Sequence, residues 1–160
     1  MRKISNLWLM LVMCVAFAGC SDDDEPKNID PQSLSGTWYI TNIRGWEYDK
    51  EAKNGKSEFN ETFNYNGQGL PVSDNKEDAE KIVIAEAGSP YLNVTPHYWG
   101  YNEYSRDWEW MSNDTGSVKL QGNKLIDGTM EVTITKLADT TMTTYQKDED
   151  GETYITYVRL

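Results

Sequence analysis

The chain has 160 residues, of which 26 are acidic and 15 basic, so its formal net charge is −11. This length accommodates one domain of ordinary size, and apolar residues make up only about a third of positions 21–160, which excludes a second core and a multi-pass membrane protein. A strongly acidic chain repels phosphate backbones, so the composition also excludes nucleic acid as a partner and electrostatic attachment to an anionic membrane.

The first 20 residues form an apolar leader, in which 15 positions are apolar or aromatic and the only basic residues are Arg2 and Lys3. The apolar run is too short for a stable membrane span and has the layout of a secretory signal. The segment Phe17-Ala18-Gly19-Cys20 resembles a bacterial lipobox, with Phe17 in place of the usual Leu. The resemblance implies a signal peptide over residues 1–19, removed before Cys20, and a lipid on the Cys20 thiol that attaches the chain to a membrane. An ordinary signal peptide or an uncleaved anchor is the alternative. Cys14 and Cys20 are the only cysteines, so we expect the mature chain to contain no disulfide and no catalytic thiol.

An acidic run, Ser21-Asp22-Asp23-Asp24-Glu25-Pro26, follows the leader. It offers no apolar side chain to bury, so residues 20–33 are predicted to be a flexible tether. Acidic residues directly after a lipidated cysteine resemble the surface-export signal of lipoproteins in the Bacteroidota. We therefore expect a lipid-anchored protein of the outer membrane on the cell surface, with the periplasmic face as the alternative.

From Leu34 onward, short segments rich in Thr, Val, Ile, Tyr and Trp alternate with turn residues, and no segment has apolar residues at helical spacing. This pattern predicts an all-β domain. The expected strands cover residues 37–46, 58–65, 81–86, 91–98, 106–111, 117–120, 124–126, 129–137, 141–147 and 153–160. In the first of them, alternation places Trp38, Ile40, Asn42, Arg44 and Trp46 on one face.

Two connecting segments have specific predictions. Residues 70–80 are expected to form a loop or a single helical turn. The sequence Asp148-Glu149-Asp150-Gly151 lacks the spacing of an EF-hand loop, so a hairpin turn is favoured over a calcium site.

Eight to ten short strands must either pack as a sandwich or close into a barrel to protect their edges, and the strand pattern alone leaves both open. The segment Leu34-Ser35-Gly36-Thr37-Trp38 resembles the opening Gly-x-Trp motif of lipocalins, and more closely that of lipocalin-like domains of Bacteroidota lipoproteins. This resemblance implies an antiparallel up-and-down barrel of about eight strands over residues 34–160.

In such a barrel the first and last strands pair, which brings Trp38 close to Arg159. The resemblance also implies that Arg159 stacks on the Trp38 ring, an interaction that contributes roughly 0.5 to 2 kcal/mol. The alternative is that Arg159 is a frayed terminal charge and Trp38 an ordinary core residue.

The sequence indicates no catalytic site, cofactor or metal site. Nucleophilic hydrolysis requires an oriented base beside the nucleophile, and the chain has a single histidine, His97, and no Gly-x-Ser-x-Gly motif. With one histidine and no mature cysteine, a zinc site is not expected either. Among enzymes, a glycosidase-like pair of carboxylates is the least disfavoured alternative.

Aromatic residues are the positive signal for binding. Residues 21–160 contain 17 of them, six of which lie between positions 98 and 110. Some of these rings fill the barrel, and others are expected to line a pocket with polar residues at its edges. The ligand-binding candidates are Asn42, Arg44, Trp46, Tyr98, Trp99, Trp108 and Trp110.

These observations predict a non-catalytic binding protein that holds a small hydrophobic or amphipathic molecule in the barrel. The alternatives are a glycan- or protein-binding accessory that uses exposed aromatic residues, and a structural component of the envelope. Asp139-Thr140-Thr141 resembles an O-glycosylation acceptor of the Bacteroidota.

Overall fold

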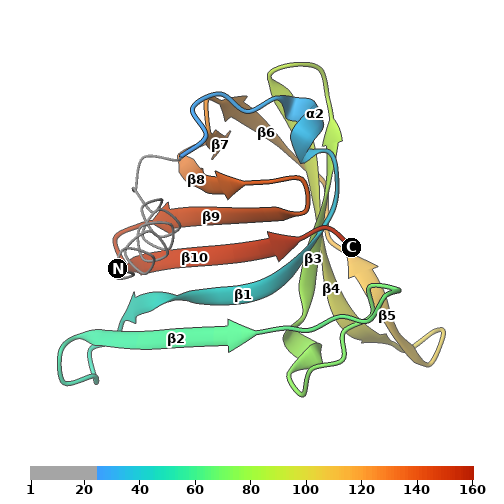
Figure 1. Cartoon of the computed structure of the whole chain (residues 1–160). Coiled ribbons are helices and arrows are strands. Elements are labelled where there is room, and N and C mark those ends of the chain that lie inside the picture. Colours follow the sequence, from blue (N-terminus) through green and yellow to red (C-terminus); the bar gives the residue numbers. More distant parts are fainter. Residues whose placement is uncertain (1–24) are drawn as a thin grey trace, which may run out of the picture.

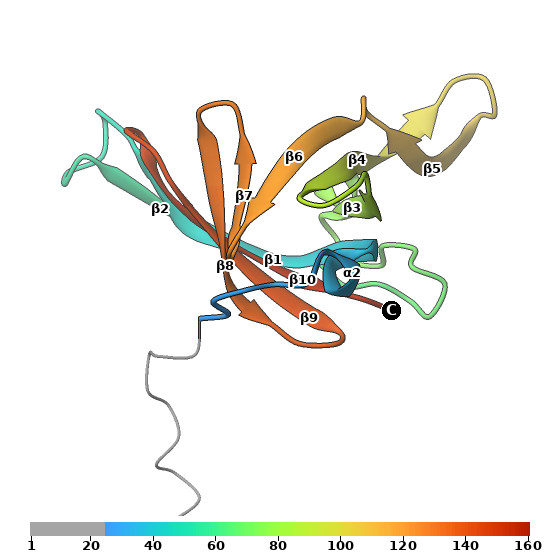
Figure 2. The ribbon, with the colours of Figure 1, turned by 90° about the horizontal axis from the view of Figure 1, so that it is seen from above.

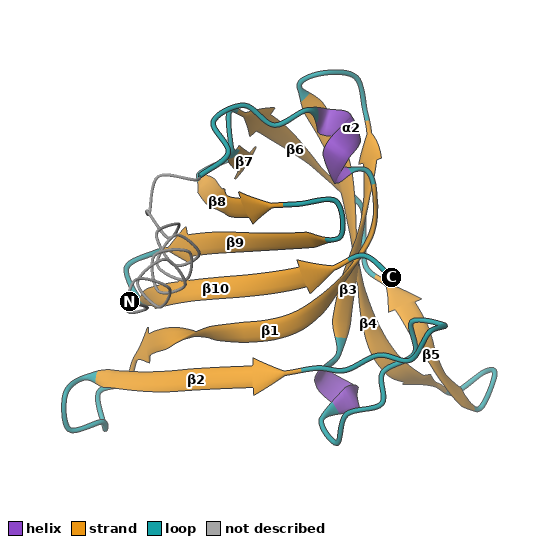
Figure 3. Cartoon of the chain, in the orientation of Figure 1, coloured by secondary structure: helices purple, strands orange, loops and turns teal. Residues whose placement is uncertain are grey.

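The computed structural model describes residues 25–160, so the predicted signal peptide and Cys20 lie outside the described residues. Besides a short 3-10 helix at Lys76–Asp78, the elements in chain order are α2 (Pro31–Leu34), β1 (Gly36–Tyr48), β2 (Lys56–Thr62), β3 (Glu80–Glu86), β4 (Tyr91–Asn102), β5 (Asp107–Ser112), β6 (Gly116–Gln121), β7 (Lys124–Asp127), β8 (Met130–Leu137), β9 (Thr141–Lys147) and β10 (Gly151–Val158) (Figure 1). Figure 3 shows how completely strands dominate the described chain. The all-β prediction is confirmed.

Eight strands close into an antiparallel up-and-down barrel in the order β1, β3, β4, β6, β7, β8, β9, β10 and back to β1. Closure depends on the pairing of β1 with β10, in which Tyr39 lies opposite Val158 and Glu47 opposite Gly151. The predicted barrel is therefore confirmed, and the sandwich alternative is wrong.

Two long strands change partners along their length. The first residues of β1 pair with β3, and from Asn42 onward the same edge of β1 pairs with β2. In β4, residues up to Val94 pair with β6, and residues from His97 onward pair with β5. Seen from above, the β4–β5 hairpin and the region around β2 extend away from the barrel in opposite directions (Figure 2). The barrel is thus short, and each of these strands continues beyond it.

A β-bulge at Thr41 changes which face of β1 the later side chains occupy, compared with the prediction. Ile40 pairs with Tyr157, but Asn42 pairs with Thr156, so β1 contains one extra residue at this point. An extra residue reverses the alternation of every side chain that follows. Ile43 therefore packs against the core, and the prediction that Asn42, Arg44 and Trp46 share a face with Trp38 is wrong.

Side chains at one end of the barrel form the core. The largest fully buried ones are Trp38, Phe63, Leu34, Ile84, Leu92, Ile134 and Met142. The N-terminal segment covers this end, because Ile29 donates a backbone hydrogen bond to Gly122 in the β6–β7 turn and packs against the core. Residues 29–33, which the sequence analysis assigned to the tether, thus lie against the barrel, and Asp30 caps α2 by accepting from the Gln32 amide.

The two connecting segments with specific predictions, residues 70–80 and 148–151, form the expected kinds of turn. The segment 70–80 contains the 3-10 turn at Lys76–Asp78. The sequence Asp148 to Gly151 forms the hairpin turn between β9 and β10, in which the Asp148 carboxylate accepts from the amides of Asp150 and Gly151.

Candidate functional site

A cavity of about 340 Å³ lies inside the barrel. It is lined by 13 residues from seven strands and one loop: Ile82, Val94, Pro96, Asp114, Gly116, Val118, Leu125, Asp127, Met130, Val132, Met142, Thr144 and Tyr157. Most of this lining is aliphatic, because the inward positions of successive short strands carry Val, Ile, Leu, Met or Pro. Small-molecule sites commonly combine such apolar walls with a few polar groups.

The strand ends show which end of the barrel the cavity reaches. Asp127 is the last residue of β7 and Met130 the first of β8, while β6 begins at Gly116. The opposite ends of β6 and β7 meet at Gly122, where Ile29 is bound. The cavity therefore opens at the end of the barrel remote from α2.

Two hydroxyl groups lie among the apolar walls. Thr144 and Tyr157 are 3% and 7% exposed, and they lie diagonally across the β9–β10 pair. Burial raises the pKa of Tyr157 to about 12, because the apolar surroundings disfavour the phenolate. This tyrosine, like an ordinary one, is a neutral polar group at pH 7, and burial extends its neutral form to higher pH.

Trp38 and Arg159 close the end of the barrel near α2. The Arg159 guanidinium carbon lies 4.1 Å from the centre of the Trp38 ring, and the indole nitrogen donates to the Leu34 carbonyl at 2.7 Å. The guanidinium donates to the carbonyls of Ser33 and Ser35 at 2.9 and 3.2 Å, and to that of Asp139 at 3.2 Å. Arg159 thus joins the last strand to both α2 and the β8–β9 turn, in the stacked arrangement that the resemblance implies.

Gly36 completes this closure. Its φ of +133° belongs to a backbone region that favours glycine, and the site of a Cβ lies 3.5 Å from Arg159 Nε. The Leu34-x-Gly36-x-Trp38 segment therefore has a physical role at each named position: a buried anchor, a backbone bend and an indole under a cation.

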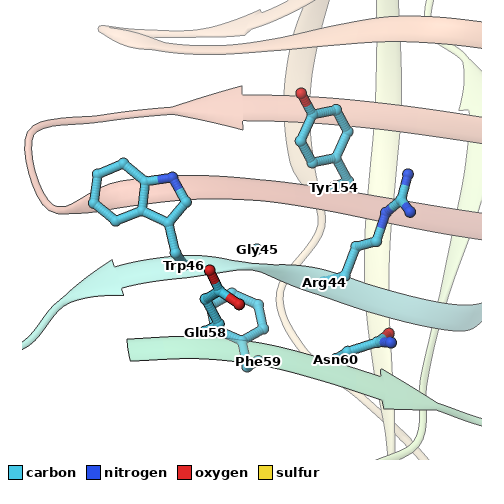
Figure 4. Close-up of a pocket in the computed structure, with 7 residues that line it drawn as sticks. All are labelled: Arg44, Gly45, Trp46, Glu58, Phe59, Asn60 and Tyr154. Atoms are coloured by element: carbon cyan, nitrogen blue, oxygen red, sulfur yellow. The ribbon is translucent and has the colours of Figure 1, made fainter. Parts of the chain in front are cut away.

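The three candidates on β1 lie outside the cavity. Arg44 and Trp46 line a shallow groove of about 410 Å³ on the outer surface, together with Gly45, Glu58, Phe59, Asn60 and Tyr154 (Figure 4). The Arg44 guanidinium lies 5.5 Å from the Tyr154 ring centre, and Lys56 Nζ lies 3.7 Å from that of Trp46. Asn42 is tied to β2 by hydrogen bonds of 2.8 Å to the Asn60 side chain and the Glu61 carbonyl.

The four candidates on β4 and β5 divide into two groups. Trp99 and Trp110 pack against the core, with ring centres 5.4 Å apart, and Trp110 donates to the Gly69 carbonyl at 3.1 Å. Trp108 instead pairs with Tyr101, which is 51% exposed. Tyr98 lies opposite Met111, on the other face of the hairpin from Trp99. The lining of the cavity includes none of the four.

The aliphatic walls and the two carboxylates of the cavity were not among the residues predicted from the sequence. The signal was present in the inward positions of the short strands, for example Val118 in β6 and Val132 in β8. Aromatic clustering predicts a different location, because the barrel places its most clustered aromatic residues on a projecting hairpin.

Two absences concern residues 25–160, the part of the chain that the structure describes. No group of three or more His, Cys, Asp or Glu side chains in this range is arranged to hold a metal ion. Within the same range, no helix is both long and apolar enough to cross a membrane.

The fold and the cavity together define an antiparallel barrel with an apolar site at one end. No family model matches the sequence, and no curated protein matches it. Similar solved structures include the siderocalin Ex-FABP, which functions through dual ligand specificities, with 11% identity over 80% of this chain and 74% of that chain, and a TM-score of 0.47. Another is a selenomethionine derivative of a biogenic amine-binding protein, with 12% identity over 88% of this chain and 72% of that one, and a TM-score of 0.49.

Proposed function

We propose that this protein binds one small amphipathic molecule in the barrel cavity and carries out no chemistry on it. The observation that carries the proposal is the cavity itself, which is walled mainly by aliphatic side chains and reaches the end of the barrel remote from α2. Its volume of about 340 Å³ lies within the usual range of about 300–1,000 Å³ for ligand pockets. A water-sized group occupies about 30 Å³, so the cavity accommodates a chain of roughly ten such groups.

The lining supports a binding role. Its polar side chains are the carboxylates of Asp114 and Asp127 and the hydroxyls of Thr144 and Tyr157. Aliphatic walls contribute about 25 cal/mol for each Å² of apolar ligand surface removed from water.

The test is a titration of the purified protein with 1-decanol, a neutral ten-carbon probe, followed by calorimetry and by the melting temperature. Binding to the folded state alone raises the melting temperature, by linkage. In Val118→Trp the indole fills the cavity, and decanol binding should fall at least tenfold. Ser117→Trp is the matched control, because Ser117 is the exposed neighbour on the same strand.

A large side chain in a packed wall also destabilises, typically by about 1–3 kcal/mol. Val132→Phe on β8 therefore serves as a second cavity variant, and circular dichroism establishes that each variant is folded. Unchanged decanol binding in both folded cavity variants, or no binding by the parent protein, would overturn the proposal.

One observation favours a second function, contact with a glycan or a protein through the β4–β5 hairpin. Tyr104 in the turn is fully exposed, and Tyr101 and Trp108 form an edge-to-face pair beside it. Aromatic side chains with such exposure are common in recognition surfaces. If this is the function, Trp108→Ala abolishes capture of envelope glycans or proteins and leaves decanol binding intact.

We also propose that the barrel is anchored in the outer membrane through a lipid on Cys20, facing the cell surface. The lipobox-like segment and the acidic residues after it support this placement. Mass spectrometry of the N-terminal peptide should find an acylated Cys20, and Cys20→Ala should release the protein from membranes. Digestion of intact cells by added protease separates the surface from the periplasmic face.

A further inference from the structure

The charged groups of the cavity are all of one sign. Asp114 and Asp127 are the only acidic side chains in the lining, which contains no lysine, arginine or histidine. Asp127 ends β7, and Asp114 precedes the start of β6. Both lie toward the open end of the barrel, so the negative charge is at the mouth and the aliphatic walls lie behind it.

Both carboxylates are available to a ligand. Within residues 25–160, neither has a hydrogen bond or an ion pair with another side chain. The lysine on the same strand as Asp127, Lys124, is paired with Glu131 at 2.5 Å. A carboxylate beside an apolar cavity, with no cation of the protein to neutralise it, favours a cationic group on whatever enters.

The polar groups deeper in the cavity, Thr144 and Tyr157, do not require a charged group on the ligand. Thr144 and Tyr157 are almost fully buried hydroxyls, and neither supplies a positive charge that would favour an anionic group at the inner end. The cavity therefore distinguishes the two ends of a ligand: an apolar end inside and a charged end at the mouth.

We infer that the ligand is an amphipathic cation, a primary or quaternary amine with an apolar tail, whose charged nitrogen lies between Asp114 and Asp127. The inference rests on the proposed function, because it names the chemical class that the same cavity selects. A fatty acid of equal length is disfavoured, since its carboxylate meets two like charges and no cation at the mouth.

The test compares three probes that share a ten-carbon tail: decylamine, 1-decanol and decanoate. Calorimetry at pH 7 and low ionic strength should give the affinity order amine, alcohol, carboxylate, with at least a tenfold step between the first two. The mouth is open to water, so 0.5 M NaCl should reduce this step without weakening decanol binding.

The double variant D114N/D127N should bind decylamine no more tightly than decanol, while its affinity for decanol stays within twofold of the parent. Asp74→Asn is the matched control, because it removes the same charge at an exposed loop position away from the cavity and should leave the amine preference intact.

The outcomes separate the two proposals. If decanol binds but decylamine binds no better, or if decanoate binds best, the inference is overturned and the proposed function stands. An amine preference that survives in D114N/D127N also overturns it. If none of the probes binds the parent protein, the proposed function fails as well.

Discussion

The guanidinium of Arg159 lies over the indole of Trp38, 4.1 Å from the ring centre, although 120 residues separate the two in sequence. One side chain comes from the end of the chain and the other from the first strand. The contact exists only when β1 and β10 are paired, so it reports on barrel closure.

Arg159→Ala should destabilise the fold by about 3 kcal/mol, because it removes the cation over the indole and the hydrogen bonds to three carbonyls. Arg159→Lys keeps the charge but not the planar fork, so roughly half of the loss is expected. Urea unfolding measures both. Lys53→Ala, at an exposed turn position, is the charge control, and equal effects of Lys53→Ala and Arg159→Ala would contradict the closing role.

Gly45→Ala should destabilise by about 3 kcal/mol, since a Cβ at this position overlaps the backbone carbonyl of Glu152. This close approach occurs where β1 pairs with β10 near the β9–β10 turn. Gly67→Ala is the matched control, because no atom lies within 4 Å of its Cβ position, and it should change stability by less than about 0.5 kcal/mol. Thermal melts of the two variants should differ clearly.

The bulge at Thr41 predicts opposite responses at neighbouring positions of β1. Ile43→Ser should cost about 1–3 kcal/mol, since Ile43 packs against the core. Arg44→Ser should cost less than about 1 kcal/mol, because Arg44 is exposed. Chemical denaturation tests the difference, and a larger loss at Arg44 than at Ile43 would mean that the strand lacks the bulge.

Alkaline pH should unfold the protein through its buried tyrosines. Burial raises the pKa of Tyr157 to about 12 and the pKa of Tyr65 still further. In the unfolded chain these groups lose their protons near pH 10, so above that pH the native state binds more protons and stability falls as pH rises. The expected slope is about 1.4 kcal/mol per pH unit for each such tyrosine.

Denaturant unfolding between pH 9 and 12 measures this slope. Tyr157→Phe should reduce it, whereas Tyr104→Phe, which changes a fully exposed ring, should not. Identical slopes in the parent and Tyr157→Phe would show that this phenol is not protected by the fold.

The two aromatic groups of the β4–β5 hairpin should respond differently to truncation. Trp110→Ala should lower the free energy of unfolding by about 3 kcal/mol. The Trp110 ring contacts those of Trp99, Tyr65 and Tyr39, and its indole nitrogen donates to the Gly69 carbonyl. Trp108→Ala removes a ring that pairs only with Tyr101 among the described aromatic residues, so a loss of about 1 kcal/mol or less is expected. Melting temperatures of the two variants decide whether this division is correct.

The strand pattern predicted the barrel well because nearly every strand is bounded by turn residues and follows a period of two. The expected segments 141–147 and 81–86 match β9 and β3 to within one residue. The faces of β1 were predicted less well, because a single extra residue at Thr41 is invisible to a strict alternation.

The candidate site was the weakest prediction for a related reason. Whether Arg44 points inward depends on that bulge, and whether Trp108 reaches the interior depends on where β4 leaves β6 for β5. Both are properties of pairing between distant segments, and local composition contains neither. Nothing in the sequence distinguishes the cavity-lining valines from ordinary core residues.

Because β1 and β4 change partners along their length, the sheet has two edge strands, β2 and β5, although a fully closed barrel has none. Within the described chain, β2 pairs only with β1 and β5 only with β4. The unpaired backbone N–H and C=O groups of an edge strand can pair with a strand of a neighbouring molecule and so extend the sheet. Both edge strands carry charged residues: β2 has the sequence Lys-Ser-Glu-Phe-Asn-Glu-Thr, and β5 has Asp-Trp-Glu-Trp-Met-Ser. These charges oppose self-association into larger β-assemblies.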